Sequence, residues 1–116
     1  MYRQGDVLIE EVKEVPPREE VKDTLLVRGE GRNHGHFIAG KNLIISKALE
    51  NELSEGGGII THYLDVQSEA DLEHLLIDSG TWTHEHNPIT IPPGKYRVIK
   101  QREYNPYSKA IRAVRD

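Results

Sequence analysis

The apolar residues of this chain come in short runs that turn-forming residues separate. Segments 6–12, 24–28 and 59–66 are rich in Val, Ile, Leu and Thr. The first ends before Pro16-Pro17, the second runs into Gly29-Glu30-Gly31, and the third follows Gly56-Gly57-Gly58. Runs of this length and β-branched content are typical of strands. Six or seven such runs at near-regular spacing predict a mainly β fold, either a compact small barrel or a sandwich.

Two neighbouring runs predict a specific pairing. Segments 34–39 and 43–46 flank the short glycine-containing loop Gly40-Lys41-Asn42, and this pattern predicts a β-hairpin. Residues 95–100 and 110–114 are expected to be the last strands.

One or two short helices are expected beside the strands. Ser46 can cap a turn or two of helix over 46–53. Segment 68–76 begins with a serine and an aspartate at the spacing of a capping box. Its leucines fit both a helical face and the alternation of a strand, and we expect a short helix there.

Length and composition narrow the class of protein. The 116 residues predict a single domain over 1–116. The absence of cysteine excludes disulfides, thiolate metal sites, iron–sulfur clusters and cysteine nucleophiles. The first residues lack the pattern of a signal peptide, and no apolar run approaches the roughly 20 residues that span a bilayer. We therefore expect a cytoplasmic protein without a membrane partner.

Charge is distributed unevenly. The net charge is −4, yet residues 95–116 carry seven basic and two acidic side chains. Such a segment suits RNA, single-stranded nucleic acid or another phosphate-bearing ligand, or an acidic face of a second subunit. The overall acidity argues against sequence-independent binding of duplex DNA. The candidate binding residues are Lys95, Arg97, Lys100 and Arg102.

Two His-x-His pairs are the strongest chemical signal. They are His34-Gly35-His36 and His84-Glu85-His86. In a strand, side chains at positions i and i+2 leave the same face, so two imidazoles can converge on one ion. We predict a metal site formed by His34, His36, His84 and His86. His62 and His74 are expected to fill ordinary structural positions.

Nitrogen ligands favour zinc, with iron or manganese as alternatives. Three protein ligands would leave a position for water, as in catalytic sites, whereas four would close the site. Glu30, which precedes His34 by four residues, is a candidate general base, as is Asp6. Glu85 is a further candidate catalytic residue. In a strand it would point away from its neighbouring histidines and would support the site or form a salt bridge rather than bind the ion, unless residues 83–87 form a loop.

Three functions remain open at this point. The first is a metal-dependent enzyme, with hydrolysis as the expected reaction. The second is a non-catalytic module that binds RNA, single-stranded nucleic acid or a protein through the basic C-terminal segment. The third is a subunit of a homo-oligomer with structural histidines. Nucleotide-binding loops of the G-x-x-x-x-G-K-[ST] type and G-x-S-x-G elbows are absent.

The chain resembles two families. An early His-x-His pair followed by a Pro-Gly turn is similar in outline to the cupins, a resemblance at the level of fold. A second resemblance depends on the segments Arg3-Gln4-Gly5-Asp6-Val7-Leu8, Gly31 through His36, His86-Asn87-Pro88-Ile89, Pro93-Gly94, Tyr96 and Gln101-Arg102-Glu103-Tyr104. Through these segments the sequence more closely resembles a family of small bacterial and phage proteins with no assigned activity. That resemblance implies a site of His34, His36 and His86.

Overall fold

The computed structural model describes residues 1–28, 34–78, 81–84 and 88–101, and for 76–78 and 81–84 it describes the backbone alone. These residues form eleven strands and no helix, which confirms a mainly β fold. It follows that no described segment is a helix able to cross a membrane. The strands are β1 (Tyr2–Gln4), β2 (Val7–Glu11), β3 (Glu20–Val21), β4 (Leu25–Arg28), β5 (His34–Gly40), β6 (Leu43–Lys47), β7 (Ile59–Val66), β8 (Ala70–Asp78), β9 (Thr81–His84), β10 (Ile89–Ile91) and β11 (Gly94–Lys100).

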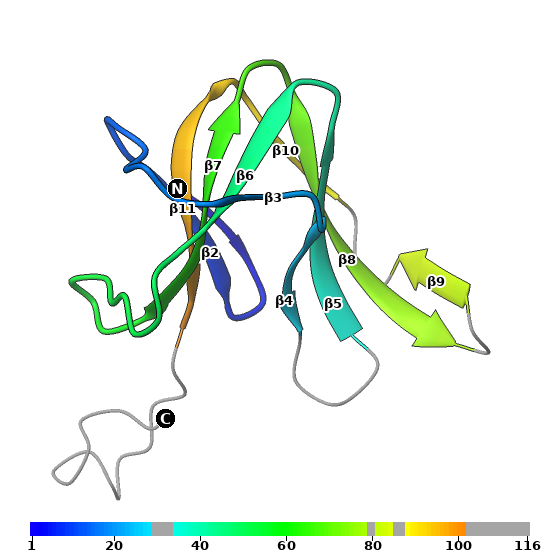
Figure 1. Cartoon of the computed structure of the whole chain (residues 1–116). Helices are drawn as coiled ribbons and strands as arrows, with labels where there is room; N and C mark the ends of the chain where they lie inside the picture. The colour runs from blue at the N-terminus through cyan, green and yellow to red at the C-terminus, as the bar shows by residue number, and fades with distance from the viewer. Residues whose placement is uncertain (29–33, 79–80, 85–87, 102–116) are drawn as a thin grey trace, which may run out of the picture.

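The strands build two antiparallel sheets that face each other across one core (Figure 1). The first sheet has the order β1-β2-β11-β7-β6-β3, and the second has the order β10-β8-β5-β4, with β9 added at β8. The two sheets do not close into a barrel, so the barrel alternative of the sequence analysis is wrong. The largest fully buried side chains of the core are Tyr96, Ile9, Ile38, Leu64, Leu72 and Ile91.

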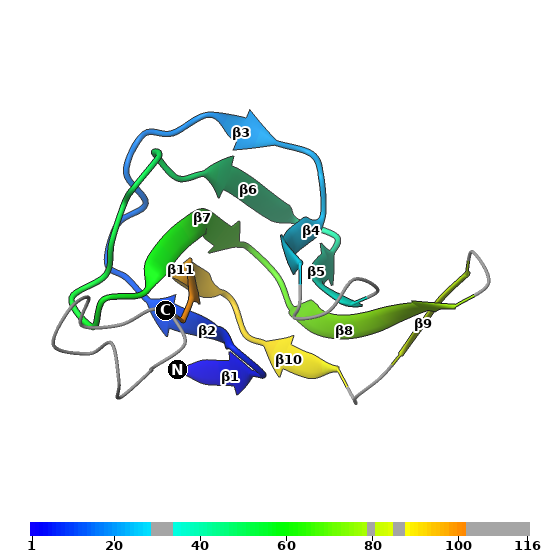
Figure 2. The same ribbon diagram turned by 90° about the horizontal axis from the view of Figure 1, so that it is seen from below.

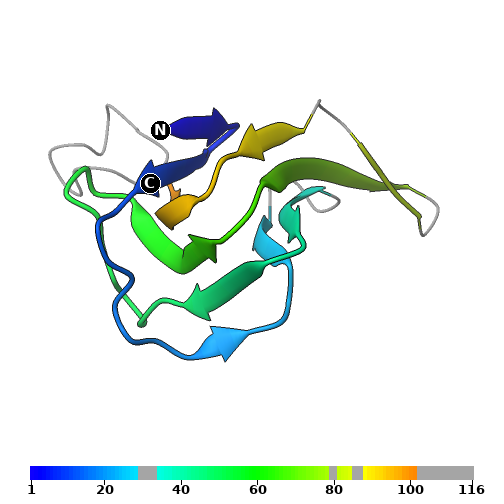
Figure 3. The ribbon, with the colours of Figure 1, turned by 90° about the horizontal axis from the view of Figure 1, so that it is seen from above.

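The predicted strands at 34–39 and 43–46 exist, but the predicted hairpin between them is wrong. β5 pairs with β4 and β8, whereas β6 pairs with β7 and β3 in the other sheet. The chain turns a corner at Lys41 and Asn42 and passes from one sheet to the other (Figure 3). This exchange puts Ile38 and Ile45 on opposite walls of the same core, where both are buried.

Both predicted helices are also wrong. Residues 70–78 form β8, which pairs with β5 along one edge and with β9 and β10 along the other. Ladder hydrogen bonds on both edges outweigh the weak local preference for helix. After β6, the chain makes one turn, with Asn51 at φ 65°, and then a single bridge between Leu53 and Ile59. The left-handed residue ends any helical run.

The turn between β1 and β2 brings the start of the chain against the second sheet. Gln4 pairs with Val7, so Gly5 and Asp6 are the two central residues of a tight hairpin. Gly5 adopts φ 62°, and a glycine at the first central position is the signature of a type II′ turn. Seen from below, β1 runs toward β10 and β8 (Figure 2). This turn positions the candidate site.

Candidate functional site

β5 carries the first predicted histidine pair. His34, His36 and Ile38 alternate on one face of the strand, and Ile38 lies in the core. The structure therefore confirms that His34 and His36 lie on the same face of this strand. His36 is 1% exposed, whereas His34 is half-buried at the beginning of the strand. Burial of the pair thus increases from His34 toward the core residue Ile38.

His74 of β8 joins these residues. It is the register partner of His36 in the β5–β8 ladder and is also buried. Its ring stacks on that of His36 with a centroid distance of 4.3 Å and an interplanar angle of 5°. The ring of His34 lies 5.6 Å from that of His74, tilted by 37°. We call His34, His36 and His74 the histidine cluster.

The β1–β2 turn covers one edge of the histidine cluster. The side-chain oxygen of Gln4 lies 2.9 Å from Nδ1 of His36, and Oδ1 of Asp6 lies 3.7 Å from its Nε2. A Cβ on Gly5 would lie 3.4 Å from Cε1 of His36, so the turn backbone packs closely on the ring. His36 therefore has a carboxamide at one ring nitrogen and a carboxylate near the other.

The rings of the cluster are not arranged as a finished metal site. Among the residues that the structure describes, no three His, Asp or Glu side chains form a group that could hold an ion. The geometry gives the reason. Lone pairs of imidazole nitrogens lie in the ring plane, so the lone pairs of the nearly parallel, stacked rings of His36 and His74 lie in two separate parallel planes.

The second predicted pair is described only in part. The backbone of His84 lies in β9 and pairs with Leu75, the neighbour of His74 in β8. Glu85 and His86 lie outside the described residues, and so does Glu30. The ligand roles of His84 and His86 and the general-base roles of Glu30 and Glu85 stay predictions.

The basic residues of β11 do not form one continuous cationic surface. Nε and Nη2 of Arg97 both contact Oε1 of Glu10 on β2, and Nζ of Lys95 lies 3.5 Å from Oε2 of Glu14. In the sheet, the backbone of Lys100 lies opposite Val7 of β2 and Ile59 of β7 at the end of the strand. Arg102 lies outside the described residues. Carboxylates beside Lys95 and Arg97 reduce the positive potential that a phosphate-bearing ligand would meet.

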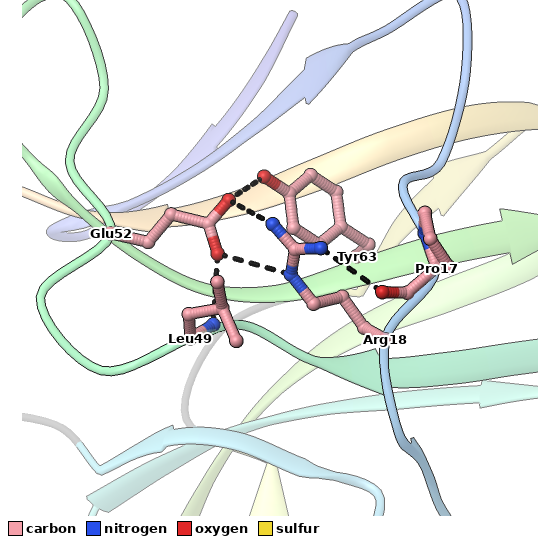
Figure 4. A network of polar contacts seen from close by, with 5 residues as sticks. All are labelled: Pro17, Arg18, Leu49, Glu52 and Tyr63. Carbon is pink, nitrogen blue, oxygen red and sulfur yellow. Dashed lines mark hydrogen bonds and ion pairs between the residues drawn. The ribbon is translucent and has the colours of Figure 1, made fainter.

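A second polar cluster lies on the outer face of the first sheet (Figure 4). Glu52 accepts hydrogen bonds from the Tyr63 hydroxyl, the Arg18 guanidinium and the Leu49 N–H. Burial of the Glu52 carboxyl opposes its ionisation, yet the bonds from Tyr63, Leu49 and Arg18 together lower its pKa. Burial, and then the bond to Glu52 and its charge, raise the pKa of Tyr63 to about 12. We call Arg18, Glu52 and Tyr63 the outer ion-pair cluster.

Sequence reasoning assigned His74 to an ordinary position and did not single out Gln4. The alternation of Leu72, His74 and Leu76 was the available signal for His74, because a strand there would put it on one face with the core leucines. Gln4 stood inside the Arg3-Gln4-Gly5-Asp6 motif, but only the tertiary structure brings it to His36. Asp6, by contrast, was a candidate carboxylate and does lie near the cluster.

Comparisons with known proteins give one match. Residues 3–101 match the family model described as "Domain of unknown function (DUF8820)", and the chain therefore belongs to this family. This confirms the resemblance to a family with no assigned activity. The search of curated proteins found no match, and neither did the search of solved structures. The outline resemblance to cupins stays a prediction.

Proposed function

We propose that this member of the DUF8820 family binds a divalent transition-metal ion, zinc first among the candidates, at the histidine cluster. The proposed first two ligands are Nε2 of His36 and the carboxylate of Asp6. The observation that carries the proposal is the approach of these two groups, from different sheets, to 3.7 Å at a largely buried position.

The separation of the two groups suits an ion between them. Two ligands of a tetrahedral zinc ion with bonds of about 2.1 Å lie about 3.4 Å apart. The measured 3.7 Å between Nε2 and Oδ1 is close to this value. A bound cation would also favour a carboxylate in this half-buried place, since it would supply the opposite charge.

Further ligands come from imidazoles near this pair. The rings of His34 and His74 lie near that of His36, and the proposal requires at least one of them to change its orientation when the ion binds. His84 and His86 remain predicted ligands. His84 pairs with Leu75 of β8, and Ile89 pairs with Leu72 of the same strand. The chain before and after residues 85–88 is therefore hydrogen-bonded to the strand that carries His74.

A metal-dependent hydrolase is the activity that we propose for this site. The ion would lower the pKa of a bound water, whose oxygen would form the new bond to the substrate as the scissile bond breaks and the leaving group takes up a proton. Glu30 and Glu85 remain the predicted general bases. The site's three imidazoles favour this proposal over a purely structural domain.

Metal analysis of the full chain, purified without a histidine tag, tests the proposal. After incubation with zinc and dialysis, wild-type protein should retain about one zinc per chain, as tetrahedral three- or four-ligand sites do. His36→Ala and Asp6→Asn should lose most of it. His62→Ala is the matched control, because His62 is a half-buried histidine on β7 in the other sheet.

Retention of zinc by His36→Ala, or no zinc in the wild-type protein, would overturn the proposal. Circular dichroism should show that each variant is folded. Asp6→Asn keeps the experiment informative if His36→Ala does not fold, since Asp6 lies in a turn with 28% of its side chain exposed.

The nucleic-acid module and the homo-oligomer remain alternatives. The pairing of Lys95 and Arg97 with glutamates weighs against the first of them. Salt-sensitive binding of single-stranded RNA that Arg97→Ala abolishes would favour it over the metal proposal.

A further inference from the structure

Gln4 connects the two sheets through its side-chain amide. The residue is 5% exposed and belongs to β1 of the first sheet. Its Nε2 donates a hydrogen bond of 3.1 Å to the carbonyl oxygen of Leu72 on β8 of the second sheet. Its Oε1 lies 2.9 Å from Nδ1 of His36 on β5. One buried amide therefore contacts both strands that carry the histidine cluster.

The chemistry of these groups fixes the position of the proton on His36. A backbone carbonyl oxygen only accepts hydrogen bonds, so the amide of Gln4 must direct its NH₂ group to Leu72. The oxygen of the amide then faces His36 and also only accepts. The hydrogen bond consequently requires a proton on Nδ1 of His36, and a neutral ring then carries its lone pair on Nε2. This is the nitrogen that faces Asp6.

Asp6 alone would favour the opposite arrangement. A carboxylate beside Nε2 attracts a proton to that nitrogen, and a protonated Nε2 has no lone pair for a metal ion. Gln4 and Asp6 thus compete for the proton of a neutral His36 from the two sides of the ring. The shorter and more deeply buried contact is the one to Gln4.

We infer that Gln4 is a positioning residue that holds neutral His36 in the Nδ1–H tautomer and so directs the Nε2 lone pair toward Asp6. The tautomer follows from the two contacts of Gln4 alone. Its use in metal binding rests on the proposed function. Metal-bound histidines commonly donate their second ring N–H to such an acceptor, and loss of the acceptor weakens metal binding about 10–100-fold.

Nitrogen-15 NMR of the full chain, treated with chelator and held at a pH where histidines are neutral, tests the tautomer. Two-bond and three-bond couplings from the ring protons distinguish a protonated nitrogen from one with a lone pair. In the wild-type protein, His36 should show a protonated Nδ1. The opposite tautomer in the wild-type protein would overturn the inference without any variant.

Two variants separate tautomer control from a structural role. Gln4→Met removes the acceptor, and His36 should shift toward the Nε2–H tautomer. Gln4→Glu keeps an acceptor at Nδ1, and His36 should remain Nδ1–H. Both variants lose the amide donor to Leu72, so a merely structural role would affect both alike. His62 signals should be unchanged in both and report on the fold.

The same variants distinguish failure of this inference from failure of the proposed function. If zinc binds, Gln4→Met should weaken its affinity about 10–100-fold and Gln4→Glu should restore most of it. If zinc does not bind at all, the tautomer measurement still decides the inference. An Nδ1–H ring in Gln4→Met would overturn it even if the wild-type protein binds zinc.

Discussion

The histidine cluster and the outer ion-pair cluster are both polar groups held against a sheet, but their chemistry differs. In the outer cluster, one carboxylate meets a guanidinium, a hydroxyl and a backbone N–H, so opposite charges and donors are matched within the chain. In the histidine cluster, three bases of the same kind lie together, and Oδ1 of Asp6 lies 3.7 Å from Nε2 of His36.

We interpret the outer ion-pair cluster as stabilising the fold, and we propose the histidine cluster as the binding site. In a matched ion-pair network, the charged groups and donors already have partners within the chain. Such a network holds loops in place and offers no further group to a ligand. The outer cluster joins the segment before β3 and the turn after β6 to β7, which is a structural task. Adjacent imidazoles repel each other when protonated, so they contribute to stability best when a cation other than a proton binds them. The following predictions test the comparison.

The largest expected effect is metal-dependent stabilisation that only the histidine cluster provides. Zinc at about 100 times its dissociation constant should stabilise the wild-type protein by about 2.7 kcal/mol. Glu52→Gln should have a lower free energy of unfolding without zinc, and zinc should raise it by the same amount as in the wild-type protein. Zinc should not raise the free energy of unfolding of His36→Ala. Urea unfolding with and without zinc measures this. Equal gains in all three proteins would remove the distinction between the clusters.

A steric change on the outer face should destabilise without affecting metal binding. A Cβ on Gly58 would lie 2.4 Å from Cγ2 of Ile99, so Gly58→Ala should cost about 2 kcal/mol through overpacking. Gly56→Ala is the control, since nothing lies within 4 Å of its Cβ position, and it should change stability by less than about 1 kcal/mol. Urea unfolding of the two variants should show the contrast, and similar stabilities would contradict it.

Alkaline pH should weaken the outer cluster. The pKa of Tyr63 rises from 10.0 to about 12 in the folded protein, so the folded state holds this proton more tightly. The stabilisation is fully present below pH 10 and is lost as the pH rises through about 12. In Tyr63→Phe, the free energy of unfolding should not show this loss at alkaline pH. Unfolding free energies between pH 9 and pH 12 measure it, and parallel curves for both proteins would contradict the assignment.

The smallest effect is expected at an exposed ion pair. Lys95 and Glu14 lie 3.5 Å apart with 41% and 83% of their side chains exposed. Lys95→Met should therefore change stability by no more than about 0.5 kcal/mol. Thermal unfolding measures it. A loss of about 2 kcal/mol or more would contradict the assignment of this contact as a weak surface pair.

Much of the fold was accessible from local patterns, but the pairing was not. The runs at 7–11, 25–28 and 95–100 became strands because their β-branched residues fit a pleated and half-buried surface. The hairpin of β5 with β6 and the helix at 68–76 failed for one reason. In both places the decisive hydrogen bonds come from strands far away in the sequence.

The candidate site divides in the same way. The shared face of His34 and His36 follows from their spacing. His74 enters because the register of β8 against β5 pairs it with His36, and a slip of one residue would send it to the other face. Gln4 and Asp6 enter because the β1–β2 turn packs on His36.

The sequence by itself determined the mainly β class, the alternation that puts His34 and His36 on one face, and the types of side chain available as ligands, since these depend on neighbours along the chain. Only the tertiary structure decided which sheet each strand joined, which histidines met and which nitrogen of His36 carries the proton. Those outcomes depend on register and on contacts between the two sheets. They are fixed by the burial of one shared core and by the need of every buried polar group for a partner.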